Sequence, residues 1–114
     1  MKKAVVFGGA GFVGSHVADY LSDADYQVTI YDKKKSHWLR ADQEMVVGDI
    51  KDKEEVSQAI VGTDVVYNFA ALADINKALK KPAETVSINI LGNINVIEAC
   101  HTHGVKRFVY ASTV

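Results

Sequence analysis

The 114-residue sequence has few of the features that mark special classes of protein. Its single cysteine, Cys100, cannot form a disulfide within the chain, so a reducing compartment such as the cytoplasm is expected. The formal net charge is −1, and no surplus of charge points to a nucleic-acid partner or an anionic membrane surface. No apolar run reaches the roughly 20 residues that span a bilayer, so no membrane segment is expected.

The beginning of the chain does not fit the pattern of a secretory leader, so none is expected there. Lys2 and Lys3 precede a short apolar run at residues 4–7, as they would in a leader. Glycines interrupt that run early, and His16 and Asp19 follow where small residues belong around a cleavage site. What remains is an ordinary globular composition, with 48% hydrophobic and 24% charged residues, and a length that suits one domain.

Short apolar runs alternate with helical patterns along the sequence. Apolar, β-branched and aromatic residues predict buried strands at residues 4–7, 27–31, 44–47, 64–69 and 106–110. Apolar residues at helical spacing predict helices at residues 12–22, 52–60 and 82–103. The segment 36–42 is expected to be a loop or a single helical turn. This alternation predicts an α/β fold, a doubly wound (Rossmann) parallel sheet of five strands with flanking helices.

The sequence ends at Val114, directly after the fifth predicted strand. A doubly wound sheet normally continues with further strands. We therefore expect residues 1–114 to form an incomplete dinucleotide-binding domain, truncated before its C-terminal strands and its substrate region.

The glycine-rich segment GGAGFVG, residues 8–14, lies between the first predicted strand and the first predicted helix. It fits the Gly-x-Gly-x-x-Gly fingerprint in the context that the fingerprint requires. Glycine allows a sharp turn, close approach of a pyrophosphate to backbone N–H groups, and tight packing of helix on strand. The helix N-terminus adds free N–H groups and partial positive charge. The alternative is a tight turn without a ligand. Because the Gly-Lys-Ser/Thr ending of a P-loop is absent, hydrolysis of a nucleoside triphosphate is not expected.

Asp32 strengthens the cofactor interpretation. It follows the second predicted strand, where an aspartate can accept hydrogen bonds from the ribose hydroxyls of adenosine. The same carboxylate repels a 2′-phosphate, which favours NAD over NADP. Three lysines at positions 33–35 could neutralise such a phosphate, although a solvated run of charge is the simpler interpretation.

Together the motifs resemble the extended short-chain dehydrogenase/reductase family, in its NAD-dependent sugar-nucleotide epimerase/dehydratase branch. The resemblance runs along the whole sequence. It rests on GGAGFVG at 8–14, YD at 31–32, GDI at 48–50, NFAA at 68–71, KP at 81–82, NILGNINVIEAC at 89–100 and RFVYAST at 107–113. Each motif is short, but their common order makes the match specific.

The resemblance implies a role for individual residues in binding NAD. The glycine segment would hold the pyrophosphate, Asp32 the adenosine ribose, and Asp49 with Ile50 the adenine. Phe69 and the two alanines after it would line the path to the nicotinamide ribose, with Asn89 behind the nicotinamide. The candidate cofactor-binding residues are Gly8, Gly11, Phe12, Val13, Gly14, Asp32, Lys33, Asp49, Ile50, Phe69, Ala70, Ala71, Asn89 and Ser112.

For some of these residues a purely structural role stays open. Asp49 could cap the helix predicted at 52–60, and Phe69 could be an ordinary core residue. Asparagine is unfavourable in the middle of a helix, which favours a functional reason for Asn89. Trp38 could cover the sheet edge or the adenine side of a cofactor, and packing is the simpler of the two.

Thr113 matches the catalytic Ser/Thr of the family, which hydrogen-bonds the reacting oxygen of the substrate. It follows the fifth strand, at the edge where open parallel sheets bind ligands. The alternative is a Ser-Thr turn at a strand end. The family mechanism also needs a tyrosine base whose pKa is lowered by the lysine of a Tyr-x-x-x-Lys pair. Tyr31 and Lys35 match that spacing, but on the adenosine side, so we interpret the match as chance.

The resemblance thus implies an NAD-dependent enzyme in which hydride passes transiently from a sugar hydroxyl carbon to the nicotinamide. Without the catalytic pair, the 114 residues are expected to bind cofactor weakly at most and not to turn over. Two alternatives stay open: a non-catalytic NAD(P)-sensing protein of the same fold, and a reductase of a non-sugar alcohol or ketone.

The helix predicted at 82–103 carries a broad apolar stripe, made of Val86, Ile90, Leu91, Ile94, Ile97 and Cys100. The family pairs this helix across a two-fold interface, so a homodimer through the 83–103 helix is expected in the full-length protein; the alternative is a helix that only covers the sheet. Cys100 is expected to pack as a small apolar residue. His101 and His103 point to different sides of the helix, so no metal site is predicted.

Overall fold

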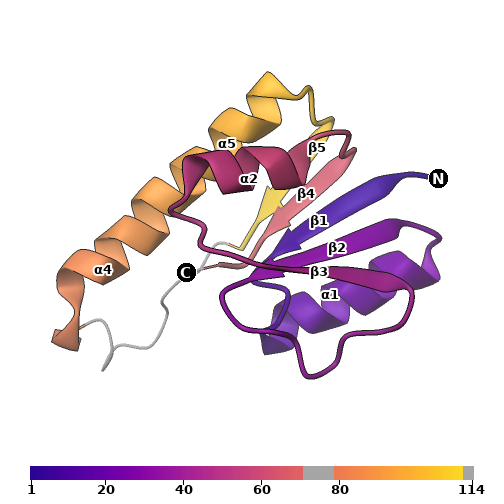
Figure 1. Cartoon of the computed structure of the whole chain (residues 1–114), viewed down its shortest axis with the longest axis horizontal. Helices are drawn as coiled ribbons and strands as arrows, with labels where there is room; N and C mark the ends of the chain where they lie inside the picture. Colours follow the sequence, from indigo (N-terminus) through magenta and orange to yellow (C-terminus); the bar gives the residue numbers. More distant parts are fainter. Residues whose placement is uncertain (71–78, 112–114) are drawn as a thin grey trace.

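The computed structural model describes residues 1–70 and 79–111. Its centre is a five-stranded parallel sheet with the order β3-β2-β1-β4-β5 (Figure 1). The strands are β1 (Lys3–Phe7), β2 (Gln27–Asp32), β3 (Gln43–Val47), β4 (Val65–Asn68) and β5 (Arg107–Tyr110). The helices are α1 (Phe12–Asp23), α2 (Lys53–Ile60), α4 (Pro82–Val86), η1 (Ser87–Gly92), which is π-helical, and α5 (Asn93–Thr102). The predicted five-stranded Rossmann-type sheet is confirmed, and each strand bound differs by at most one residue.

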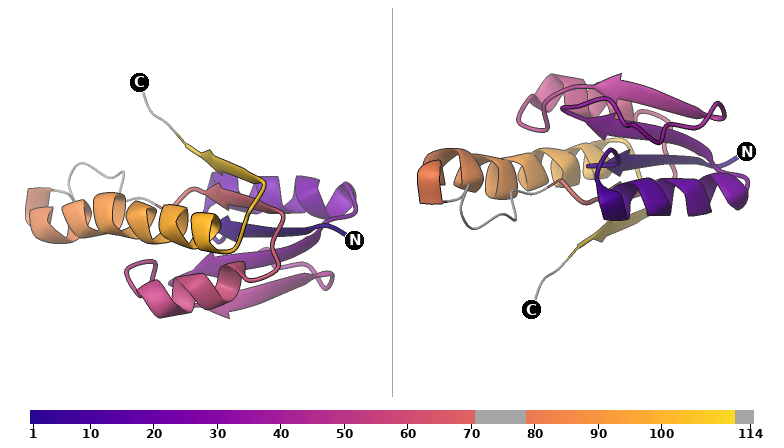
Figure 2. Two further views of the ribbon diagram at one scale, coloured as in Figure 1. Left: turned by 90° about the horizontal axis from the view of Figure 1, so that it is seen from above. Right: turned by 90° about the horizontal axis from the view of Figure 1, so that it is seen from below.

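β1 lies in the middle of the sheet because both of its faces are apolar. Ala4 and Val6 pack with the buried side chains of α1, whereas Val5 and Phe7 pack with those of α2 and α5. Figure 2 shows α1 on one face of the sheet and the other helices on the opposite face. Burying a side chain of this size stabilises a fold by about 1.5–3 kcal/mol, so the central strand contributes a large share of the core.

The helix ends follow local sequence signals. The side chain of Asp52 caps α2 by accepting a hydrogen bond from the backbone N–H of Glu55, at 3.1 Å. The alternative that Asp49 caps this helix is therefore wrong. Gly62 and Gly104, with φ of 71° and 65°, follow α2 and α5 in the left-handed conformation typical of glycine after a helix.

The long helix predicted at 82–103 is present as one continuous rod, formed by α4, η1 and α5 (Figure 1). The sequence did not predict its π-helical middle, where the backbone is wider than in an α-helix. The face toward the core carries Ile88, Gly92, Asn95, Val96, Ala99 and Cys100. Within the described ranges, no helix has the length and apolar character needed to cross a bilayer.

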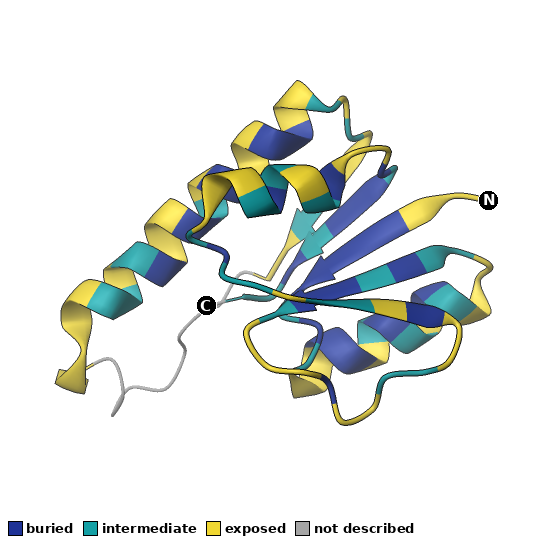
Figure 3. Cartoon of the chain, viewed as in Figure 1, coloured by how far each residue is buried: buried dark blue, intermediate teal, exposed yellow. Residues whose placement is uncertain are grey.

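The predicted apolar stripe of this rod does not face the sheet. Cys100 is buried as expected, but the other five residues of the stripe are exposed, Ile90 by 56% and Leu91 by 46%. Figure 3 shows exposed residues along the outer side of the rod. The rod thus covers the sheet with a different face, and most of the predicted stripe lies on the opposite side of the helix.

Candidate functional site

A cleft of about 270 Å³ opens at the carboxyl ends of the strands. It lies where the chain order of the strands reverses, because β1 has β2 on one side and β4 on the other. Ligands of open parallel sheets bind at such a switch point. The lining residues are Gly8, Gly11, Tyr31, Asp32, Lys33, Gly48, Ile50, Phe69, Ala70 and Ile88.

The glycine turn between β1 and α1 has no room for side chains at two positions. Gly8 has a φ of 76°, and a Cβ there would lie 2.7 Å from the backbone of Phe69 and Ala70. A Cβ on Gly14 would collide with the carbonyl oxygen of Gly8. The turn therefore brings the start of α1 against β1 and β4, as the fingerprint predicts.

The N-terminus of α1 faces the cleft beside this turn. Gly11 lines the cleft and is the N-cap residue, so Phe12, Val13 and Gly14 form the first turn of the helix. N–H groups of a first turn have no partner within their helix and carry partial positive charge. The side chains of Phe12 and Val13 are exposed. Their contribution to an anion site would thus come from the backbone.

The carboxylate of Asp32 is held against the glycine turn. One oxygen accepts a hydrogen bond from the backbone N–H of Ala10 at 3.0 Å, and the other accepts one from Lys34 N–H at 3.3 Å. Asp32 lies at the end of β2 and lines the cleft. The two amides fix the side chain beside the turn, so that a negative charge lies close to the N-terminus of α1.

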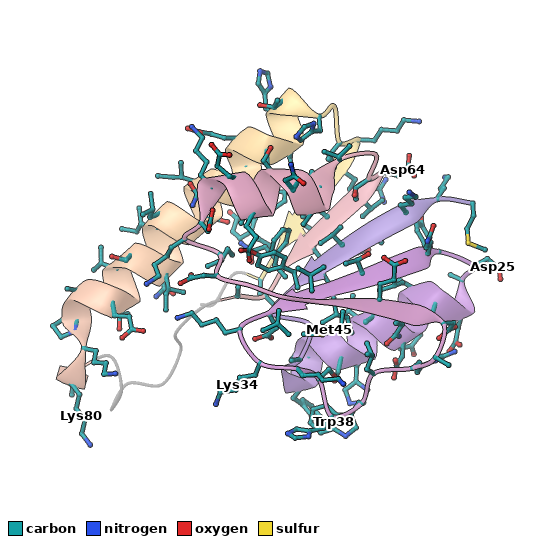
Figure 4. All side chains as sticks on the ribbon, viewed as in Figure 1. Asp25, Lys34, Trp38, Met45, Asp64 and Lys80 are labelled. Carbon is teal, nitrogen blue, oxygen red and sulfur yellow. The ribbon has the colours of Figure 1, made fainter. Side chains whose placement is uncertain are left out.

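Lys33 lines the cleft, but its charge is shared with two acids. Its ammonium nitrogen lies 4.0 Å from the carboxylate of Asp49 and 3.9 Å from that of Glu84. Figure 4 shows the neighbouring Lys34 and Trp38 on the loop after β2, directed away from the sheet. Trp38 is exposed and neither packs into the core nor lines the cleft.

Ile50 is buried and lines the cleft, whereas Asp49 lies beside it without belonging to the lining. The Asp49 carboxylate accepts a hydrogen bond from the backbone N–H of Lys51, at 2.9 Å. Asp49 also lies 3.8 Å from the ammonium group of Lys51. The structure thus brings both predicted adenine-side residues to the same loop, with the apolar one directed at the cleft.

The end of β4 forms the opposite wall through Phe69 and Ala70. The backbone N–H of Ala70 donates to the side chain of Asn68 at 3.0 Å, and Asn68 in turn donates to Asn93 of α5 at 2.9 Å. Phe69 is half-buried, and it packs against the core cluster on the α1 side as well as lining the cleft. Phe69 therefore both contributes to the core and lines the cleft, and its role toward a cofactor stays a prediction.

Several predicted site residues do not line the cleft or lie outside the residues that the structure describes. Asn89 is exposed on η1, where its neighbour Ile88 faces the cleft instead. Ala71, Ser112 and Thr113 lie outside the described residues. In residues 1–70 and 79–111, no group of three His, Cys, Asp or Glu side chains could hold a metal ion.

Three lining residues were not predicted: Tyr31, Gly48 and Ile88. The Tyr31 hydroxyl donates to Glu55 at 2.9 Å and lies 3.0 Å from the carbonyl oxygen of Asp49. Two effects raise the pKa of Tyr31: burial, which is the larger, and the hydrogen bond to Glu55. A phenol with a raised pKa stays protonated at neutral pH and cannot act there as a general base. This agrees with the interpretation of Tyr31 and Lys35 as a chance match.

Comparison with known proteins agrees with the family resemblance given by the sequence motifs. A 32% identical relative, a putative UDP-glucose 4-epimerase of Methanocaldococcus jannaschii, aligns with 96% of this chain and 37% of its own length. A 3-beta-hydroxysteroid dehydrogenase of Mycolicibacterium neoaurum is also 32% identical, over 97% of this chain and 32% of its own length. The crystal structure of Thermus thermophilus UDP-glucose 4-epimerase in complex with NAD superimposes with a TM-score of 0.88 at 31% identity, over 97% of this chain and 37% of that one.

The chain thus spans about a third of the length of the relatives it matches. The model of one family, the NAD-dependent epimerase/dehydratase family, matches residues 4–114, which include the glycine turn, Asp32 and the end of β4. By this match and by the arrangement of the cleft, the chain belongs to the NAD-dependent epimerase/dehydratase family.

Proposed function

We propose that this chain is the NAD-binding part of an enzyme that epimerises or dehydrates a nucleotide sugar by transient hydride transfer. The observation that carries the proposal is the meeting of two features at one cleft. The glycine turn has no space for a Cβ at Gly8 or Gly14, and the Asp32 carboxylate is fixed beside it by two backbone amides. One feature suits a pyrophosphate and the other suits a ribose diol.

Each residue of the cleft has a distinct task in this proposal. The first-turn amides of α1 bind the pyrophosphate, and Asp32 accepts hydrogen bonds from the adenosine ribose. Ile50 packs on the adenine, while Phe69 and Ala70 line the path to the nicotinamide. NAD itself supplies the hydride acceptor. Asp32 also disfavours NADP, because its carboxylate repels a 2′-phosphate. Lys33, which lines the cleft, is already shared by two carboxylates and so is less able to neutralise that phosphate.

The substrate class is proposed from the relatives. Two of the relatives described above are named as a UDP-glucose 4-epimerase, one of them as a putative one. UDP-glucose is a nucleotide sugar. A second candidate is a reductase of a non-sugar alcohol or ketone, which the equally identical steroid dehydrogenase favours. Both candidates use the same cofactor cleft, so the choice depends on residues that contact substrate.

We propose further that residues 1–114 bind NAD without turnover. The sequence contains one Tyr-x-x-x-Lys match, and its tyrosine, Tyr31, is 1% exposed and hydrogen-bonded within the protein. Thr113, the proposed partner of the reacting oxygen, would act together with residues of a longer protein. A nucleotide-sugar epimerase or dehydratase assay that detects turnover by the 114-residue chain would contradict this proposal.

A homodimer through the rod of residues 82–102 is proposed on its exposed apolar side chains. Val86, Ile90, Leu91, Ile94 and Ile97 are each 44–56% exposed on the side away from the core. Exposed apolar side chains that gather on one surface mark interaction sites of soluble proteins. The single cysteine, buried in the core, is in keeping with the proposed cytoplasmic location.

Calorimetric titration with NAD and NADP tests the cofactor proposal. The wild-type chain is expected to bind NAD more tightly than NADP. Asp32→Asn is expected to weaken NAD binding about tenfold to hundredfold, the effect of a lost hydrogen bond to a charged group. Asp42→Asn, a matched change in the loop before β3, is expected to leave NAD binding unchanged. Equal NAD affinity in the wild type and Asp32→Asn, or a wild-type preference for NADP, would contradict the proposal.

A further inference from the structure

We infer that Tyr31 is a positioning residue that, together with Asn95, holds the Gly48–Ile50 loop in the shape that receives adenine. The inference rests on the proposed function, since it concerns the loop that carries Ile50 at the cleft. Tyr31 acts through the loop backbone, and its hydroxyl is occupied by protein partners. Asn95 of α5 also acts through the loop backbone, since its side-chain amide donates to the carbonyl oxygen of Ile50.

The Tyr31 hydroxyl joins three elements of the fold. It reaches from β2 to the Oε1 atom of Glu55 in α2, at 2.9 Å, and to the carbonyl oxygen of Asp49, at 3.0 Å. The Tyr31 side chain is 1% exposed, and its ring packs on Phe7 with 4.8 Å between ring centroids. Because the ring is held by the core, the hydroxyl is a fixed point against which the loop is placed.

Gly48 shows how closely the loop passes over this hydrogen bond. A Cβ at position 48 would lie 2.7 Å from the Tyr31 hydroxyl oxygen and would collide with Oε1 of Glu55. The backbone N–H of Gly48 also donates to the carbonyl oxygen of Asp32, at 3.0 Å. The loop thus begins beside the backbone of Asp32 and runs across the Tyr31–Glu55 pair, with no space for a side chain at position 48.

Asn95 of α5 holds the next carbonyl of the loop. Its side-chain amide donates to the carbonyl oxygen of Ile50 at 3.1 Å, and both residues are buried. Gly92, one turn earlier on the rod, approaches Ile50 so closely that a Cβ there would lie 2.7 Å from its Cγ2 atom. The carbonyls of residues 49 and 50 are therefore both fixed, one from β2 and one from α5.

Fixing two consecutive carbonyls fixes the peptide planes on both sides of the Ile50 Cα atom. The direction of the Ile50 side chain into the cleft is then set before a ligand arrives. Preorganisation of this kind lowers the cost of ordering a loop on binding. We expect the loss of this preorganisation to weaken the binding of ligands that contain adenine. The effect would act through Ile50 and not through a direct contact of the Tyr31 hydroxyl.

The test is a double-mutant comparison in the 114-residue chain. Tyr31→Phe keeps the ring and removes the hydroxyl, and it is expected to weaken NAD and ADP binding about threefold to tenfold, the effect of one hydrogen bond. In the Ile50→Ala background the same change is expected to have little effect, because the contact that it positions is already lost. Tyr67→Phe, on β4 in the α1-side cluster, is the matched control and is expected to leave both affinities unchanged.

Amide hydrogen exchange of the free chain gives a second readout. Tyr31→Phe is expected to speed exchange in residues 48–51 while the exchange of the β1 amides stays as in the wild type. If Tyr31→Phe does not fold at the assay temperature, Glu55→Ala takes its place in both measurements. A merely structural role predicts parallel losses in melting temperature and affinity that add to those of Ile50→Ala, and that result would overturn the inference.

The outcomes separate this inference from the proposed function. If the wild type binds NAD and Tyr31→Phe binds it equally tightly, the positioning role is overturned and the proposed function stays intact. Failure of the wild-type chain to bind NAD even weakly overturns the proposed function, and the role in adenine binding with it.

Discussion

The glycine turn at residues 8–14 and the rod at residues 82–102 lie on two sides of the same cleft, yet they are specified in different ways. In the turn, backbone meets backbone: Gly8 and Gly14 leave no space for a Cβ, and the constraint acts within a few residues. In the rod, both sides are rich in apolar residues, and only tertiary contacts select Ile88 and Val96 for the core. Local constraints are readable from sequence, whereas the choice between two apolar helix faces is made by the rest of the fold.

The largest expected effect comes from breaking the turn. Gly8→Ala adds left-handed strain and a clash with the end of β4, and it should lower the free energy of unfolding by about 2–4 kcal/mol. Gly62→Ala is the matched control: its φ of 71° is similar to the 76° of Gly8, but no atom lies within 4 Å of the added Cβ. Gly62→Ala should lower the free energy of unfolding only through left-handed strain, by about 1 kcal/mol. Urea denaturation measures both, and equal losses would mean that close packing of the turn contributes nothing.

The inner side of the rod can be tested at Cys100. Burial raises the pKa of this thiol to about 11. At pH 8 its thiolate population should be about a hundredfold smaller than that of an unhindered cysteine, and alkylation should be slower by at least that factor. The rate should rise with pH until about pH 11. Iodoacetamide labelling followed by mass spectrometry measures it; equal rates in the native and urea-unfolded chain would contradict burial of this face.

The outer side of the rod should respond through association. Ile94→Asp places a charge in the exposed apolar row and should weaken the proposed dimer about tenfold or more, because an interface centre tolerates an unpaired charge poorly. Val61→Asp, at a similarly exposed position after α2, is the control. Sedimentation velocity over a concentration series measures both variants. A wild-type chain that stays monomeric throughout would contradict the proposed dimer.

Most of the fold was predictable because its signals are local. The β1 strand is apolar on both faces, the glycine turn follows it directly, and Gly62 and Gly104 take the left-handed conformation after their helices. The position of Asp32 at the cleft followed from its place at the end of β2, since strand ends of a parallel sheet meet at one edge.

The remaining features depend on partners that are distant in sequence. Tyr31 looked like any aromatic residue in a strand, because its partner Glu55 lies in another element. The hydrogen bond between Asn68 and Asn93 is equally remote in sequence. The direction of Ile88 was missed because the exposed residues of the rod have helical spacing too, so hydrophobic periodicity alone does not say which side faces the core.

Amide NMR spectra of the 114-residue chain, recorded with increasing NAD, test the central claim most directly. The account predicts that the largest shifts fall on the amides of residues 11–14, with further shifts at Asp32 and Ile50. Shifts that leave residues 11–14 unchanged at saturating NAD, or that gather at the amino-terminal ends of the strands, would contradict it.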